Sequence, residues 1–236
     1  MNIKHCLVLV GLIASQGCTF AKKITSVLVT VDNLSLLEKE TAFLGPDDMV
    51  IFDVDDVLLA KEDAIFHLGK EHKQLFQKLF GSGSRMSALS DVQKKHLESI
   101  YIAQRPYVLV DKKMPKIIEK YQKKGVKAIA LTAIDGGKKG VIECRADWRY
   151  DQLKKEGIDF SKSFPLDEPL LFHPGKLSFG ATLQPLLKFI VAKRGIVCVG
   201  SYAKGPALTA FLKQVKWKLR RIIFIDDNRA WVKSVS

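Results

Sequence analysis

The segment Met49-Val-Ile-Phe-Asp53-Val-Asp55 places four apolar residues directly before a carboxylate, and a second carboxylate follows two positions later. An unbroken apolar run is typical of a strand buried on both faces of a parallel sheet. Because residues i and i+2 of an extended chain point the same way, we expect Asp53 and Asp55 to project side by side. Ligands of open α/β sheets bind at the carboxyl ends of the strands, so these acids mark a candidate site.

Two adjacent carboxylates repel each other unless a cation or a shared proton relieves them. A divalent metal is the simplest relief, and magnesium suits oxygen ligands of this kind. The same residues also fit an acidic turn after a strand, because Asp is common in turns. Taken alone, the segment leaves both interpretations open.

The chain contains three further apolar runs, and each is followed by polar residues suited to chemistry. Helical periodicity and glycines separate the runs, which predicts an α/β fold with a Rossmann-like parallel sheet flanked by helices. The carboxyl ends of such strands lie along one edge, so the polar residues are expected to meet there. The runs are residues 128–131 before Thr132, residues 196–199 ahead of Lys204, and residues 222–225 before Asp226 and Asp227.

This set of side chains suits phosphoryl transfer. One carboxylate can attack phosphorus to form an aspartyl phosphate, and a second can protonate the leaving oxygen and later activate water. A hydroxyl, a lysine and a metal can hold the negative charge that shifts in the transition state. Because enzymes lower barriers by roughly 8–23 kcal/mol, several of these groups must act together.

With these residues in this order, positions 50–228 resemble the haloacid dehalogenase (HAD)-like hydrolase superfamily. Its motifs are an apolar strand ending in Asp-x-Asp, one ending in Thr or Ser, a lysine, and a strand ending in paired acids. An acid two residues beyond the nucleophile implies the phosphatases and phosphomutases of this superfamily rather than its transport ATPases or dehalogenases. The matching residues are Asp53 with Asp55, Thr132, Lys204, and Asp226 with Asp227.

The resemblance implies a catalytic role for four residues. Asp53 would be the nucleophile, and Asp55 would be the general acid and then the general base. Thr132 would bind the phosphoryl group, and Lys204 would pair with both the nucleophile and the phosphate. The alternative sources of the third-motif lysine are Lys193 and Lys176.

The resemblance also implies a Mg²⁺ cofactor held by acids from the first and fourth motifs. Asp53 would bind the metal through its carboxylate, and Asp55 through its backbone carbonyl. Asp226 would anchor the metal, and Asp227 would assist or orient it. The metal ligands expected from the sequence are therefore Asp53, Asp55, Asp226 and Asp227.

The α/β core is expected to comprise residues 22–59 and 106–236, with residues 60–105 as a small helical cap insertion. Apolar residues recur at helical intervals over 65–80, and a second helix is expected over 89–102, opening at Ser90. A lid of this kind would exclude water and select substrates. An ordinary pair of covering helices would give the same pattern.

Residues 1–21 have the features of a secretory signal peptide: a basic start, a short apolar core at 7–14 and small residues around Ala21. The apolar core is shorter than the roughly 20 residues that a membrane-spanning helix needs. We therefore expect export to the periplasm or beyond, with lipidation at Cys18 or an uncleaved anchor as alternatives. With this leader, the chain looks like exported bacterial acid phosphatases and an uncharacterised exported branch of the superfamily.

The chain has 236 residues, a formal charge of +13 and a pI near 9.5, which favours anionic partners such as phosphate esters, nucleic acid or anionic lipid. The basic residues are mixed with acids, as expected for solvated helix faces, and there is no basic-aromatic motif for single-stranded nucleic acid. A small phosphorylated substrate is therefore favoured over nucleic acid. The sequence leaves open whether Cys144 and Cys198 form a disulfide.

Four other segments carry expectations of their own. A helix is expected over 141–156, another over 182–191, and irregular chain or a short hairpin over 164–176. Residues 145–149 (Arg-Ala-Asp-Trp-Arg) could help to bind substrate, or could form a helix with a Trp face and exposed arginines. The chain stops at Ser236, soon after the fourth motif, where superfamily members usually continue with a helix and often a strand.

The sequence therefore predicts an exported, Mg²⁺-dependent phosphomonoester hydrolase that acts through an aspartyl phosphate. One alternative is a phosphotransferase or phosphomutase with the same intermediate. Another is a non-catalytic surface or interaction protein on the same fold, which the short C-terminus favours. The substrate and the oligomeric state cannot be inferred from the sequence.

Overall fold

The computed structural model describes residues 6–12, 26–31, 33–62, 74, 78, 88–174 and 189–235. Its strands are β1 (Cys6–Leu12), β2 (Ser26–Val31), β3 (Asp48–Phe52), β4 (Leu59–Lys61), β5 (Tyr107–Leu109), β6 (Lys127–Thr132), β7 (Leu170–Phe172), β8 (Ile190–Lys193), β9 (Ile196–Cys198) and β10 (Arg221–Asp226). Its helices are α1 (Leu34–Glu40), α3 (Asp91–Gln104), α4 (Met114–Lys123), α5 (Arg145–Lys155), α6 (Lys204–Val215) and α7 (Arg229–Val235), with a short 3₁₀ helix at Phe160–Lys162.

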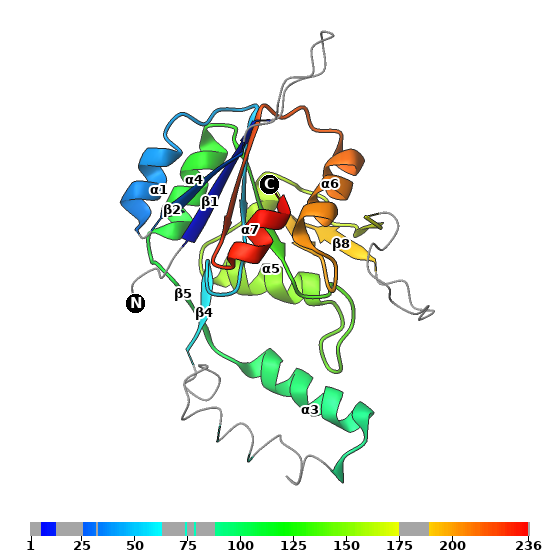
Figure 1. Ribbon diagram of the computed structural model, residues 1–236. Helices are drawn as coiled ribbons and strands as arrows, with labels where there is room; N and C mark the ends of the chain where they lie inside the picture. The colour runs from blue at the N-terminus through cyan, green and yellow to red at the C-terminus, as the bar shows by residue number, and fades with distance from the viewer. Residues whose placement is uncertain are drawn as a thin grey trace.

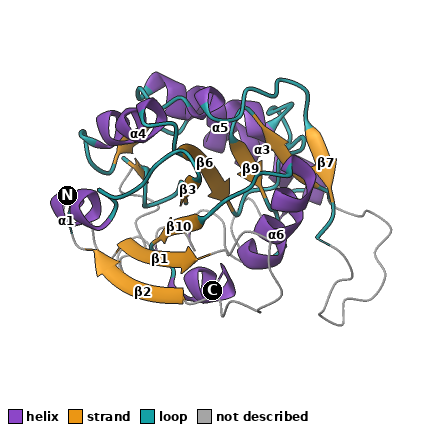
Figure 2. Ribbon diagram, turned by 90° about the horizontal axis from the view of Figure 1, so that it is seen from above, coloured by secondary structure: helices purple, strands orange, loops and turns teal. Residues whose placement is uncertain are grey.

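An eight-stranded sheet with the order β2-β1-β10-β3-β6-β9-β8-β7 forms the centre of the molecule (Figures 1 and 2). The middle strands β10, β3, β6 and β9 pair in parallel, and the strands on both sides of them pair antiparallel. The structure therefore confirms an α/β fold with a mostly parallel central sheet flanked by helices.

Strand β3 lies inside the sheet because all five of its residues are buried. Its side chains alternate between two apolar cores, as the period of an extended strand requires. Val50 and Phe52 pack with residues of α1, α4 and α5, whereas Met49 and Ile51 pack with residues of α6 and α7. Figure 2 shows the same two layers, with α4 and α5 on one side of the sheet and α6 on the other.

The strand order creates a topological switch point beside β3. From β3 the chain moves through α4 to β6 and through α5 to β9, and then returns through α6 to β10 on the opposite side of β3. Ligand sites of open α/β sheets form at such reversals, outside the carboxyl ends of the two strands. In this protein those ends carry the predicted first and fourth motifs.

The segment before β9 differs from its expectation. The predicted helix over 182–191 is wrong at its end, because Ile190–Lys193 is strand β8, hydrogen-bonded to β7 and β9. Arg194 and Gly195 both have positive φ (49° and 78°), which suits a tight turn between antiparallel strands. Residues 175–188 lie outside the described part of the chain.

Helix α5 starts later than the sequence pattern indicated. The expected helix began at 141, whereas α5 begins at Arg145. Before it, Lys139 and Ile142 exchange backbone hydrogen bonds, and Gly140 adopts a φ of 55°. This local turn uses the backbone groups that a longer helix would need.

The cap region is described in part. Helix α3 opens at Ser90 as expected, because Ser90 and Gln93 form a reciprocal capping box. It lies beyond the carboxyl ends of the central strands in Figure 1, attached through the antiparallel pair β4–β5. An ion pair between Lys139 and Glu98 at 2.9 Å also ties α3 to the loop after β6. The other expected cap helix, over 65–80, lies outside the described residues except for positions 74 and 78.

Part of the predicted leader is a strand in the structure. Strand β1 pairs antiparallel with β10 on one side and with β2 on the other. Residues 1–5 and 13–25, with Cys18 and the cleavage point at Ala21, lie outside the described residues. A cleaved leader and a sheet strand are therefore alternative uses of residues 6–12, and cleavage stays a prediction.

In the described ranges, no helix has both the length and the apolar character needed to cross a lipid bilayer.

A covering helix follows the fourth motif. Helix α7 buries Val232 in the same core as α6 and β10. The backbone of Gly205 in α6 lies so close to the carbonyl of Ser234 that a Cβ atom at Gly205 would collide with it. The two helices thus pack backbone to backbone beside the first turn of α6, which carries Lys204.

Candidate metal centre and catalytic site

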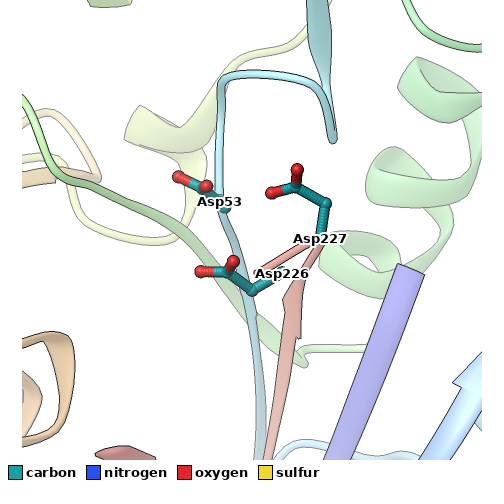
Figure 3. A group of neighbouring side chains, drawn as sticks. All are labelled: Asp53, Asp226 and Asp227. Carbon is teal, nitrogen blue, oxygen red and sulfur yellow. The ribbon is translucent and has the colours of Figure 1, made fainter. Parts of the chain in front are cut away.

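Three carboxylates converge at the switch point between β3 and β10. Asp53 follows the last residue of β3, Asp226 ends β10, and Asp227 comes next in the chain. One oxygen atom from each lies within 4.8 Å of the others (Figure 3). Asp53 and Asp226 are buried, whereas Asp227 is exposed. The parallel pairing of two motif-bearing strands therefore brings together acids that are far apart in the sequence.

A buried lysine lies between two of these acids. The Nζ atom of Lys204 is 2.8 Å from Asp53 Oδ1 and 2.6 Å from Asp226 Oδ2, and its side chain is fully buried. The same ammonium lies 5.6 Å from the ring centre of Phe224 and 5.9 Å from that of Trp231. Helix α7, which carries Trp231, therefore forms part of the lysine's surroundings.

Backbone amides fix the orientation of the two buried carboxylates. The N–H of Val54 donates to Asp53 Oδ1 at 2.7 Å, and the N–H of Asn228 donates to Asp226 Oδ1 at 2.8 Å. The Val54 N–H and the Lys204 ammonium thus both contact the same oxygen of Asp53, Oδ1. Its second oxygen, Oδ2, has no hydrogen bond to any other described residue and is the oxygen available to a ligand.

The negative charge of the site exceeds its positive charge. If ionised, the three acids carry three negative charges against the single charge of Lys204. Burial raises the pKa of Asp53 to about 7; the nearby Asp226 carboxylate adds to the rise, and Lys204 opposes it. Partial burial of its carboxyl group, with Asp226 and Asp56 nearby, also raises the pKa of Asp227. A divalent cation would remove this imbalance, and three carboxylates are a fitting donor set for Mg²⁺.

Thr132 lies at the carboxyl end of β6, the neighbour of β3. Its side chain is fully buried, and its hydroxyl has no hydrogen-bond partner among the described residues. A buried hydroxyl without a partner is costly unless a ligand or water completes it. The position therefore suits a hydrogen bond to an oxygen of a bound anion.

Asp55 has a different partner from Asp53. Strand β3 ends at Phe52, and the chain turns after Asp55 through Asp56, whose φ is 62°. The expectation was that Asp53 and Asp55 project side by side, but the two carboxylates have different partners in the structure. Arg149 Nη2 donates to both carboxylate oxygens of Asp55 at 3.1 Å. Asp55 is also not part of the carboxylate cluster, and coordination through its backbone carbonyl stays a prediction.

The structure distinguishes among the three candidate lysines. Lys204 contacts the two buried acids, whereas Lys193 Nζ lies 2.8 Å from Asp147. Lys176 lies outside the described residues. Lys204 is therefore the described lysine that the fold brings to the predicted site.

Sequence reasoning left the role of residues 145–149 open, and the structure places both arginines in ion pairs. Arg149 is only 2% exposed and binds Asp55, and Arg145 Nη2 lies 2.6 Å from Asp135 Oδ2. The alternative of exposed arginines on a helix face is therefore wrong.

Cys144 and Cys198 are both free thiols.

Comparisons with curated proteins and with solved structures found no match. Residues 30–236 match the family described as "Protein of unknown function (DUF2608)". This match spans most of the chain and contains every residue of the candidate site described above. The chain therefore belongs to this family of unknown function, DUF2608.

Proposed function

We propose that this protein is an exported, Mg²⁺-dependent phosphomonoester hydrolase of the HAD-like type. The observation that carries the proposal is the arrangement of Asp53, Asp226 and Asp227 around the buried Lys204, beside the unpartnered hydroxyl of Thr132. This arrangement lies at the carboxyl ends of three adjacent parallel strands. It provides anionic ligands for a metal and neutral or cationic donors for a phosphate within one site.

In the first step, the carboxylate of Asp53 attacks phosphorus. A P–O bond to Asp53 forms as the ester P–O bond breaks, and Asp55 gives its proton to the leaving oxygen. Lys204 and Thr132 donate hydrogen bonds to the phosphoryl oxygens as charge moves onto them. A Mg²⁺ ion held by Asp53, Asp226 and Asp227 would neutralise charge on the phosphoryl group.

In the second step, water attacks the phosphorus of the aspartyl phosphate. Asp55, now a carboxylate, accepts a proton from that water, and the bond between phosphorus and Asp53 breaks. Inorganic phosphate leaves and the carboxylate of Asp53 is restored. An alcohol in place of water would give the phosphotransferase alternative, and product analysis with competing alcohols distinguishes the two.

The test is release of inorganic phosphate from a generic aryl phosphate, measured with Mg²⁺ and then with a chelator. We expect release by the wild type with Mg²⁺ only, and a loss on the order of 10⁴-fold or more in Asp53→Asn, because the nucleophile is removed. Circular dichroism must show that the variant keeps its fold. Full activity in that variant, or activity that persists in the chelator, would contradict the proposal.

A further inference from the structure

Arg149 is a buried cation whose place in the fold is tightly fixed. Its guanidinium carbon lies 4.8 Å from the ring centre of Trp148 and 5.3 Å from that of Tyr107. Nη1 donates to Gln152 Oε1 at 3.1 Å, and Nη2 lies 3.1 Å from both oxygens of Asp55. Two aromatic rings and an amide therefore hold the guanidinium while one of its nitrogens spans the carboxylate.

The carboxylate of Asp55 remains accessible on another side. The Asp55 side chain is 33% exposed, whereas the Arg149 side chain is 2% exposed. Arg149 thus fixes the orientation of Asp55 from inside the protein and leaves part of the carboxylate open to solvent or substrate. Among the described residues, Asp55 is the one acid within ion-pair distance of Arg149.

The two acids of the first motif are held from opposite faces of the sheet. Lys204 reaches Asp53 from α6, and Arg149 reaches Asp55 from α5. Residues of α5 belong to one apolar core and residues of α6 to the other. The two acids therefore pair with different buried cations, Asp53 with the lysine that it shares with Asp226 and Asp55 with Arg149.

We propose that Arg149 is a positioning residue, which holds the carboxyl group of Asp55 toward the leaving-group oxygen of a bound phosphoester. This inference rests on the proposed function and adds a residue to it. Arg149 does not touch the reacting atoms; it acts through Asp55. Its loss should therefore matter most for substrates whose leaving group depends on proton donation.

Leaving groups separate this role from a structural one. An alkyl phosphate releases a strongly basic alkoxide and needs a correctly oriented acid, whereas a nitrophenyl phosphate releases a stable phenolate and needs little help. In Arg149→Met we expect kcat/KM for the alkyl ester, which reports only the steps up to departure of the leaving group, to fall on the order of 10²-fold, the range typical of general acid catalysis. We expect kcat/KM for the nitrophenyl ester to fall much less, because its leaving group needs little proton donation. Hydrolysis of the aspartyl phosphate is common to both esters and does not enter kcat/KM.

Two companion variants make the test specific. Arg194→Met is the matched control, because Arg194 pairs with Asp167 and lies over Tyr150 of the same helix, α5. In Arg194→Met, the ratio of kcat/KM for the alkyl ester to kcat/KM for the nitrophenyl ester should stay within about twofold of the wild-type ratio. A small effect is expected because the ion pair of Arg194 is partly exposed. In Asp55→Asn, adding Arg149→Met should not lower the ratio further, because both changes remove the same function.

The outcomes distinguish the inference from the function on which it rests. A wild type that hydrolyses neither ester would overturn the proposed function itself. A wild type that hydrolyses both, with equal losses of kcat/KM for the two esters in Arg149→Met, would overturn the role of Arg149 alone. A lower ratio of alkyl to nitrophenyl activity in the double variant than in Asp55→Asn alone would also overturn the role of Arg149. Arg149 would then act independently of Asp55.

Discussion

Strand β3 has a buried aspartate at each end, and the two acids have opposite surroundings. At the amino end, Asp48 Oδ2 lies 2.7 Å from Arg221 and 3.1 Å from Arg220. At the carboxyl end, Asp53 shares one lysine with a second buried acid, Asp226. Positive charge exceeds negative charge around Asp48, and negative charge exceeds positive charge around Asp53.

The pKa values of the two acids move in opposite directions. Burial alone would raise the pKa of Asp48, but hydrogen bonds from Arg221, Arg220 and the Gly45 backbone lower it to about 2. Burial raises the pKa of Asp53 to about 7, because the attraction of one shared lysine does not offset desolvation and the repulsion from Asp226. The negative charge of Asp48 is balanced by groups of the protein itself. The negative charges of Asp53 and Asp226 are balanced only when a cation or a proton binds to them.

This difference separates a structural end of the sheet from a candidate functional end. The arginines at Asp48 hold the start of β10 against the start of β3, and they add to the strand pairing. The acids at Asp53 would repel each other in the metal-free protein, which is a stability cost typical of binding sites. The predictions below test this contrast, beginning with the largest expected effect.

Lys204 is the cation on which the acidic end depends. Lys204→Met keeps an apolar stem of similar length but removes the ammonium group that contacts Asp53 and Asp226. We expect kcat/KM for an aryl phosphate to fall on the order of 10³-fold, because a donor to the phosphoryl group is lost. The metal-free protein should lose about 3–5 kcal/mol of unfolding free energy, since buried carboxylates remain unpaired. Steady-state kinetics and urea unfolding measure the two effects. Unchanged kcat/KM in a folded variant would contradict the role given to Lys204.

The two ends of β3 should respond to pH in opposite ways. The pKa of Asp53 is higher in the folded protein than in the unfolded one, so the metal-free folded state loses stability as pH rises from about 4 to about 7. The pKa of Asp48 is lower in the folded protein, so its contribution is present above about pH 4 and is lost as pH falls toward 2.

Unfolding free energies measured in chelator separate these contributions. At pH 8 we expect the unfolding free energy of metal-free Asp53→Asn to be higher than that of the metal-free wild type by up to about 3–4 kcal/mol. This difference should vanish near pH 4. Added Mg²⁺ should stabilise the wild type more than the variant, because it binds the folded acids. If Asp53→Asn is less stable than the metal-free wild type at pH 8, the acidic end is not under electrostatic strain.

The amino end offers the complementary substitution. Asp48→Asn removes one charge from the cluster of Asp48, Arg220 and Arg221, and both arginines remain partly exposed and can be solvated. We expect a loss of about 2–3 kcal/mol at neutral pH, which shrinks below pH 4. Phosphatase activity should stay within about twofold of the wild type, because the cluster lies at the opposite end of β3. A large loss of kcat in a folded Asp48→Asn protein would show that the two ends are not independent.

Much of the fold and of the acidic end of β3 could be predicted from local sequence. Four apolar runs identified the parallel strands, and the polar residues after them identified the edge where Asp53, Thr132 and Asp226 lie. Position 204 could be selected because it opens the helix after β9, and the strand order then brings it to the acids. These inferences worked because burial on both faces of a strand leaves a strong and local hydrophobic signal.

Other features depend on contacts between distant segments. The partner of Asp55 is Arg149, which is 94 residues away in the sequence, and no spacing connects them. The helix predicted over 182–191 included the first two residues of strand β8, because a short apolar run fits either period, and the turn at Arg194 and Gly195 was not recognised. Strand β1 has the composition of a signal-peptide core. Its alternative use as a strand follows from pairing with β10 and β2.

The most direct test of the account is whether Asp53 becomes phosphorylated. Wild-type protein would be mixed with an aryl phosphate and Mg²⁺, quenched in acid within one turnover and digested for mass spectrometry. We expect one phosphoryl group on the peptide that contains Asp53, absent from Asp53→Asn and from the chelated wild type. Phosphate release without any phosphorylated Asp53, or a phosphoryl group on a different residue, would contradict the claim that the unbalanced end of β3 carries the nucleophile.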